Sequence, residues 1–131
     1  MSSTGLNFLC FKLSPMEDLK QRKYEACRPD APKATESEIA TYSKAIPEWK
    51  IIQDEGLDKL VRCYSTQKYA ETLKLVNLIA DLSEEEGHHP VMIFEFRQLT
   101  VYWWSHKMKG LHVNDFICAA KCDEIYEGLS A

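Results

Sequence analysis

Apolar side chains recur with helical spacing in three segments of the chain, residues 34–46, 68–87 and 112–129. The main stripe of the second segment consists of Tyr69, Leu73, Val76 and Ala80. The first segment opens with Thr35 and Glu38, whose spacing is that of a capping box at a helix N-terminus. Gly87 fits the C-terminal end of the second helix. We therefore predict three helices.

Four shorter segments have the composition of β-strands. Residues 48–55 and 57–66 flank a turn signal, and residues 91–97 and 98–106 are rich in β-branched and aromatic side chains. Two hairpins imply an antiparallel sheet, which needs helices over one face because isolated hairpins are unstable in water. The predicted fold class is α+β, a two-layer sandwich with three α-helices packed on one face of a four-stranded antiparallel sheet.

Residues 1–33 differ from the rest of the chain. They carry six basic and four acidic side chains with little periodicity, and the two prolines of RPDAP indicate an irregular backbone. We predict a flexible N-terminal arm over 1–33 and one domain over 34–131. A chain of 131 residues with 45% apolar side chains can bury a core without metals or disulfides.

Charge and cysteine content narrow the functional classes. The formal net charge of −4 argues against direct binding to nucleic acid, and no apolar run reaches the roughly 18 residues that span a membrane. The five cysteines are odd in number and lack a CxxC pair, which favours a reducing compartment. We expect a cytoplasmic protein, with a nuclear location or a weak organellar presequence left open. Cys118 and Cys122 are interpreted as small buried side chains rather than a metal or redox pair.

The candidate chemistry lies in three histidines. His88 and His89 begin the third predicted strand, and His106 ends the fourth. A hairpin folded about Arg97 and Gln98 places His106 across from His88 or His89, where Cβ atoms lie roughly 4.5–5.5 Å apart. Imidazole has a reference pKa of about 6.5, so both protonation states exist near neutrality. Such a cluster suits an elimination, in which one atom gains a proton while another loses one.

Two carboxylates stand close to the histidines in the chain. Glu84 lies four residues before the first histidine, and Asp115 is at helix position N3 if His112 is the N-cap. Asp115 is either a helix cap or an acid that orients a histidine or holds a ligand N–H, and both roles can coexist. Glu85 and Glu86 are interpreted as a solvated acidic face, and His112 as a surface or capping residue.

Three histidines also match the ligand count of a zinc site. Pro90 biases His89 towards an extended backbone, and two adjacent ligands on such a backbone diverge, so we predict no metal. Trp103 and Trp104 must point to opposite faces of their strand. One of them is assigned to the core. The other, which shares a face with His106, is a candidate for stacking on a ligand.

The segments EEEGHHP, YWWSH and GLHVNDF together resemble the pterin-4a-carbinolamine dehydratase family, as do the upstream IPEWK and YAETLKLVNLIADLSEEEGHHP. The likeness covers residues 34–129. Its specific features are an acid four residues before the first histidine, the His-His-Pro triplet, a third histidine eighteen residues after the first, and an aspartate nine further on. Departures from the family pattern at Thr66, Gly87 and His112 remove no catalytic group.

The resemblance implies both a function and a site. It implies a hydro-lyase that converts 4a-hydroxytetrahydropterin to quinonoid dihydropterin and water in tetrahydrobiopterin recycling, without a metal or bound cofactor. The catalytic histidines that it implies are His88, His89 and His106. The substrate contacts that it implies are Glu84, Gly87, Pro90, Trp104, Ser105, Lys107 and Asp115.

The resemblance also implies partners. These are a pterin substrate, a second copy of the chain in a homodimer or homotetramer, and an aromatic amino-acid hydroxylase in the same pathway. As an alternative function it implies a protein-binding dimerisation cofactor, transcriptional coactivator or assembly factor that uses the same fold. The presence of all three histidines favours the enzyme.

Overall fold

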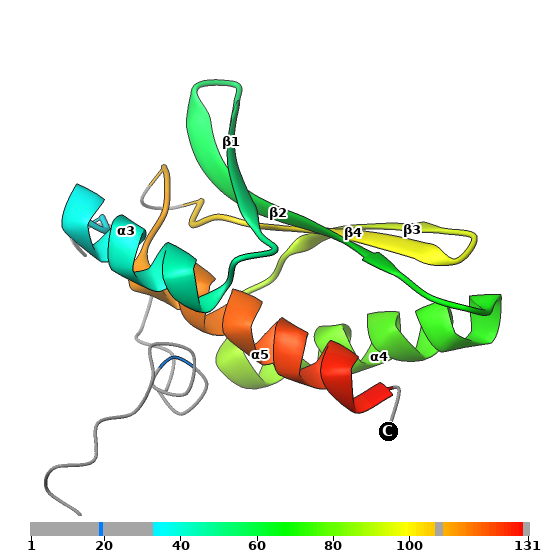
Figure 1. Cartoon of the computed structure of the whole chain (residues 1–131). Helices are drawn as coiled ribbons and strands as arrows, with labels where there is room; N and C mark the ends of the chain where they lie inside the picture. The colour runs from blue at the N-terminus through cyan, green and yellow to red at the C-terminus, as the bar shows by residue number, and fades with distance from the viewer. Residues whose placement is uncertain (1–18, 20–32, 107–108, 130–131) are drawn as a thin grey trace, which may run out of the picture.

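Figure 1 shows the computed structural model of the chain, which describes residues 19, 33–106 and 109–129. Seven elements follow one another in the order α3 (Glu36–Ala45), β1 (Lys50–Asp54), β2 (Leu57–Ser65), α4 (Tyr69–Glu86), β3 (Val91–Glu95), β4 (Gln98–Trp103) and α5 (Val113–Leu129). This is the predicted order of helices and strands. The element boundaries differ from the predicted ones by at most three residues.

The strands form one antiparallel sheet in the order β1-β2-β4-β3. The three helices lie on one side of this sheet (Figure 1), which confirms the predicted α+β fold. The capping box of Thr35 and Glu38 at the start of α3 is present, with both of its hydrogen bonds. Glu55 and Gly56 form the predicted turn between β1 and β2, and both take a positive φ.

The core lies between the sheet and the helices. Side chains on the inner face of the sheet alternate with outward ones, and the most deeply buried are Leu60, Tyr64, Leu99, Val101 and Trp103. Helix α5 is buried on all sides over its first half, as expected of a helix that is apolar all round. Cys118 and Cys122 belong to this core, and burial raises the pKa of both thiols. They are therefore protonated, inert core side chains.

The β3–β4 hairpin differs from the prediction in its register. Glu95 pairs with Gln98, so the turn consists of Phe96 and Arg97 rather than Arg97 and Gln98. The Arg97 carbonyl accepts the backbone N–H of Thr66 at 3.0 Å, a long-range contact that strand composition does not reveal. Because this holds the turn one residue earlier, every pair in the ladder shifts with it.

The shifted register changes the place of the third histidine. Strand β4 ends at Trp103, three residues before His106. Continuing the pairing past the strand ends would bring Ser105, not His106, opposite His88. The prediction that His106 lies directly across from His88 or His89 is therefore wrong.

Leu19 and Lys33 are the described residues of the predicted N-terminal arm, and Lys33 is exposed. Leu19 is fully buried in the core, and the rest of the arm up to residue 32 lies outside the described residues. The domain boundary after residue 33 stays a prediction. None of the helices in the described part of the chain combines the length and apolar character that crossing a membrane requires.

Candidate active site

The two adjacent histidines directly follow the end of helix α4. Gly87 caps this helix in the left-handed conformation, with φ 64° and ψ 27°, as the sequence predicted. No atom lies within 4 Å of the position that a Cβ would take, so glycine is favoured by the backbone and not by space. After the turn, His88 points inward and is 5% exposed, whereas His89 is exposed.

His88 is held by a buried carboxylate. Its Nε2 lies 2.6 Å from Oδ1 of Asp115, and its ring packs on Trp103 with 5.1 Å between ring centroids. The other oxygen of Asp115 accepts hydrogen bonds from Ser105 Oγ and from the backbone N–H of His112, both at 2.9 Å. Asp115 thus joins the ends of α4 and β4 to the start of α5.

His112 is the N-cap of helix α5. Its ring Nδ1 accepts the backbone N–H of Asn114 at 3.2 Å, which places the ring proton on Nε2. The Asp115 carboxylate in turn accepts a hydrogen bond from the backbone N–H of His112. The start of the helix therefore has the reciprocal pattern of a capping box. The capping interpretation of both residues is confirmed. The surface interpretation of His112 is wrong, because the residue is 4% exposed.

His89 forms a second pair at the molecular surface. Its Nε2 lies 2.9 Å from Oε1 of Glu84, and the two side chains are 62% and 79% exposed. Both residues were predicted for the site, and α4 brings them together because its last turn lies next to the chain that follows Gly87. An imidazole with a carboxylate partner in water can exchange protons with a ligand.

His106 forms a third group with an aromatic partner. Its ring packs on Trp104 with 4.5 Å between ring centroids and 42° between the ring planes, and Lys59 of β2 places Nζ 4.0 Å from the Trp104 ring centroid. Trp103 is the tryptophan in the core, and Trp104 is only half-buried. Lys107, another predicted contact, lies outside the described residues.

The predicted site residues therefore meet where α4 ends, β4 ends and α5 begins. They form the groups His88–Ser105–Asp115, Glu84–His89 and Trp104–His106. Gly87 and Pro90 flank the two adjacent histidines in the chain. Within the described residues, no group of three or more His, Cys, Asp and Glu side chains is placed to hold a metal ion.

Comparison with known proteins identifies the family of the chain. The profile of the family described as pterin 4 alpha carbinolamine dehydratase matches residues 32–125. The chain belongs to this family. The match includes every residue predicted for the site.

Curated relatives extend the match beyond that range. A protein from Nitrosococcus oceani is 47% identical over 110 residues, which are 84% of this chain and 97% of the relative. One from Saccharophagus degradans is 46% identical over 113 residues, 86% of this chain and all of the relative. Both bear the name "Putative pterin-4-alpha-carbinolamine dehydratase". Since only six residues follow position 125, both alignments must also include residues before position 32.

One solved structure supports the fold assignment. The crystal structure of a transcriptional coactivator/pterin dehydratase from Brucella melitensis superposes with a TM-score of 0.65 at 21% sequence identity. The superposition covers 72% of this chain and 98% of the Brucella melitensis chain. At this identity the likeness concerns the fold alone.

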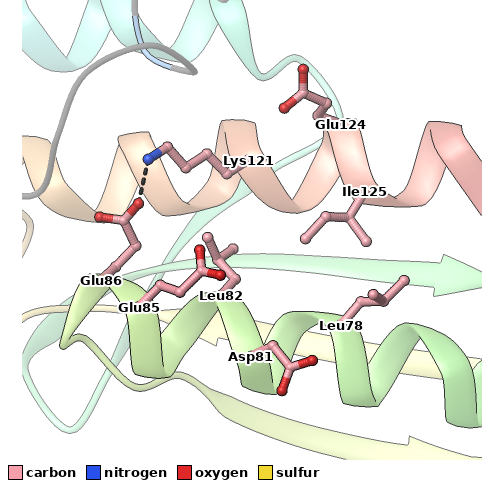
Figure 2. A pocket seen from close by; sticks show the side chains of 8 residues that line it. All are labelled: Leu78, Asp81, Leu82, Glu85, Glu86, Lys121, Glu124 and Ile125. Carbon is pink, nitrogen blue, oxygen red and sulfur yellow. Dashed lines mark hydrogen bonds and ion pairs between the residues drawn. The ribbon is translucent and has the colours of Figure 1, made fainter.

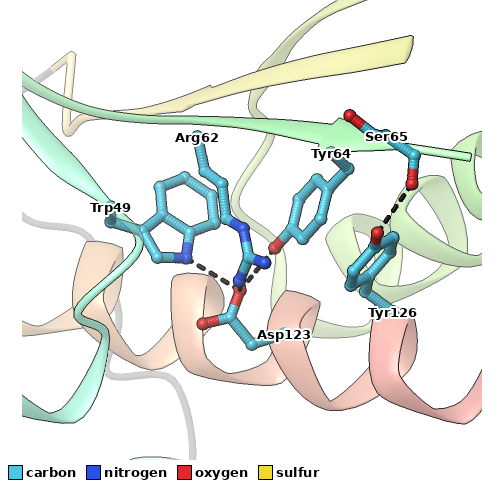
Figure 3. Close-up of polar contacts among 6 residues, drawn as sticks. All are labelled: Trp49, Arg62, Tyr64, Ser65, Asp123 and Tyr126. Carbon is cyan, nitrogen blue, oxygen red and sulfur yellow. Dashed lines mark hydrogen bonds and ion pairs between the residues drawn. The ribbon is translucent and has the colours of Figure 1, made fainter.

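A buried aspartate fixes helix α5, and with it the site, in this member of the pterin-4a-carbinolamine dehydratase family. Oδ1 of Asp123 accepts hydrogen bonds from Trp49 Nε1 at 2.9 Å, Arg62 Nη1 at 2.7 Å and Tyr64 Oη at 2.6 Å (Figure 3). Asp115 lies eight residues earlier on the same helix. This role of Asp123 was not predicted from the sequence, where its only signal is an acid among the mostly apolar residues of a helix.

The acidic end of α4 is partly used in helix packing. Lys121 of α5 makes an ion pair with Glu86 (Figure 2), so the solvated interpretation of Glu86 is wrong, because α5 lies beside it. Glu85 is exposed, as predicted. The groove between the two helices has a volume of about 380 Å³ and is lined by Leu78, Asp81, Leu82, Glu85, Glu86, Lys121, Glu124 and Ile125.

Proposed function

We propose that this chain is a hydro-lyase that dehydrates 4a-hydroxytetrahydropterin to quinonoid dihydropterin in tetrahydrobiopterin recycling. In this reaction the C4a–O bond breaks, the hydroxyl leaves with a proton as water, and a ring N–H loses a proton. The observation that carries the proposal is the grouping of three histidines, each with its own partner, at one end of a family fold.

The three histidines differ in exposure, and this supports a division of roles. Exposed His89 and His106 can reach a ligand and exchange protons with it. His88 is enclosed, and Asp115 already accepts two other hydrogen bonds, so Asp115 is the acceptor and His88 Nε2 the donor in their pair. We assign to that pair the task of holding one end of the site in a fixed geometry.

The proposed chemistry uses no metal or bound cofactor. Imidazole can both donate and accept a proton near neutral pH, so two imidazoles suffice for the two proton transfers. The Glu84 carboxylate, 2.9 Å from the His89 ring, would stabilise the imidazolium that forms when His89 takes a proton. Trp104 offers an aromatic face beside His106 on which a flat ring can stack.

A stopped-flow assay on synthetic 4a-hydroxytetrahydropterin tests the proposal, with the uncatalysed loss as baseline. We expect His106→Ala to lower the rate by about 10²-fold or more, the scale of general acid–base catalysis. The matched control is Lys109→Asn, which removes an exposed charge from the same loop and tolerates the positive φ found there. A His106→Ala protein as fast as the parent would refute the assignment.

We further propose that the chain forms a homodimer or homotetramer and serves an aromatic amino-acid hydroxylase pathway. Support for self-association comes from edge strand β3, where Val91 and Ile93 are 43% and 46% exposed. Light scattering on the purified chain tests the oligomeric state.

The alternative function is that of a dimerisation cofactor. It would be favoured if the unmutated protein had no dehydratase activity and bound a transcription factor.

A further inference from the structure

Lys59 is enclosed to a degree that is unusual for lysine. It alternates with the core residue Leu60 along β2, so its side chain lies on the face of the sheet away from the helices, yet it is only 7% exposed. Lysine is almost never fully buried unless it is paired. Its ion-pair partner Asp54, 2.8 Å away, is itself 52% exposed, so this pair alone does not explain the burial.

The indole of Trp104 encloses the Lys59 ammonium. The 4.0 Å between Nζ and the ring centroid is the geometry of a cation–π interaction. Leu60 pairs with Trp103, so one further step along the two strands places Lys59 beside Trp104. Because β4 ends at Trp103, however, no ladder hydrogen bonds fix the backbone of Trp104. Its ring packs partly against the hydrophobic core, and its polar neighbours are Lys59 and His106.

The support of His106 differs in kind from that of the other site histidines. Asp115 and Glu84 hold His88 and His89 through carboxylates. Within the described residues, the His106 ring instead packs at a tilt on the Trp104 ring. Whatever sets the orientation of the Trp104 indole thus also sets the position of this imidazole.

We propose that Lys59 is a positioning residue of the site, which holds the Trp104 indole by a cation–π contact and through it places His106 for proton transfer. Asp54 keeps the ammonium at the ring. The inference rests on the proposed dehydratase function. A shift of about 1 Å in a catalytic group can cost about 10²-fold in rate, so loss of this contact is expected to reduce turnover.

The first experiment measures kcat and KM in the stopped-flow dehydration assay. Lys59→Met, which removes the charge and keeps a long flexible side chain, should lower kcat about 10-fold and change KM less than about 2-fold. Lys59→Arg, which keeps a cation for the indole, should restore kcat to within about 3-fold of the parent. Lys50→Met on β1 is the matched control, because Lys50 is exposed on the same face of the sheet.

The second experiment isolates Trp104 by near-ultraviolet circular dichroism. The Trp104 signal is the difference between a protein and its Trp104→Phe variant, and Lys59→Met should reduce this difference by about half or more. In a Trp104→Leu background, which has no aromatic ring at this position, Lys59→Met should change kcat less than about 2-fold, because the ring that transmits its effect is gone.

These measurements can each overturn the inference. A Lys59→Met protein that keeps both the parent kcat and the parent Trp104 signal excludes the positioning role. An equal loss of kcat in the Trp104→Leu background shows that Lys59 does not act through the indole. If the parent chain has no dehydratase activity, the proposed function fails, and an unchanged or reduced Trp104 signal still decides whether Lys59 orients the indole.

Discussion

Replacing Asp123 by asparagine tests the main polar link between helix α5 and the sheet. Three donors, Trp49 Nε1, Arg62 Nη1 and Tyr64 Oη, converge on one carboxylate oxygen of a side chain that is 4% exposed. Asparagine keeps the shape and one carbonyl oxygen but removes the charge. The variant therefore weakens all three hydrogen bonds without creating a cavity.

The expected loss of stability follows from the number and type of these bonds. Hydrogen bonds to a charged acceptor are worth roughly twice neutral ones, so each of the three loses about 0.5–1 kcal/mol. Arg62, only 17% exposed, also loses its counter-charge. The sum is a loss of about 2–4 kcal/mol in the free energy of unfolding. Asp123→Ala would leave three donors unpaired and cost about 5 kcal/mol, close to the whole stability of a small domain.

Urea unfolding followed by tryptophan fluorescence measures this loss. The unfolding midpoint should fall while the m-value stays constant, which shows that stability and not compactness has changed. Glu127→Gln is the matched control, because Glu127 is an exposed acid on the same helix and its loss should change stability by less than about 0.5 kcal/mol.

A double-mutant cycle with Tyr64→Phe checks that the effect arises from the hydrogen bonds. The cost of Asp123→Asn should be smaller in the Tyr64→Phe background, because one of the three donors is already absent. A stability of Asp123→Asn within about 0.5 kcal/mol of the parent, or strict additivity of the two changes, would show that the observed cluster does not hold α5 in place.

Three further predictions concern the same framework. Gly87→Ala should cost about 1 kcal/mol in unfolding free energy and Gly87→Asn less, because φ is 64° there and asparagine tolerates this backbone; equal costs would refute the explanation. Burial raises the pKa of Tyr64, Cys118 and Cys122 in the folded protein, so these groups stay protonated there. Above about pH 9 the same groups ionise in the unfolded chain only, and the free energy of unfolding therefore falls as the pH rises. Denaturation at pH 9–11 should show stability falling by at least about 1.4 kcal/mol per pH unit, with a smaller slope in Cys118→Ala. Ser105→Ala removes one donor from Asp115 and should lower kcat about 10-fold in stopped flow, whereas an unchanged kcat would separate Ser105 from the site.

Local signals in the sequence were sufficient to predict the elements and their order. The capping box of Thr35 and Glu38, the turn at Glu55 and Gly56 and the helix stop at Gly87 all appear in the structure. Each depends on interactions between residues at most four positions apart, which spacing and residue type reveal directly. The same holds for Asp115 at position N3 of its helix.

Contacts between distant segments account for what the sequence did not predict. The observed register of the β3–β4 hairpin differs from the predicted one by one or two residues. A backbone hydrogen bond between Thr66 and Arg97, which are 31 residues apart, accompanies the observed register. The sequence predicted His106 for the site, but it did not predict that the ring next to His106 would be Trp104 rather than the other two histidines.

Burial of polar groups was the least predictable property. Asp123, Lys59 and His112 resemble ordinary surface residues in the sequence, and all three are less than 10% exposed. Whether a charged side chain can be buried depends on donors or acceptors from other elements, because burial without such partners costs several kcal/mol. The sequence therefore determined which groups were present and which local elements carried them. Packing of α5 and β2 against their neighbours determined which of these groups met, since those contacts join residues far apart in the chain.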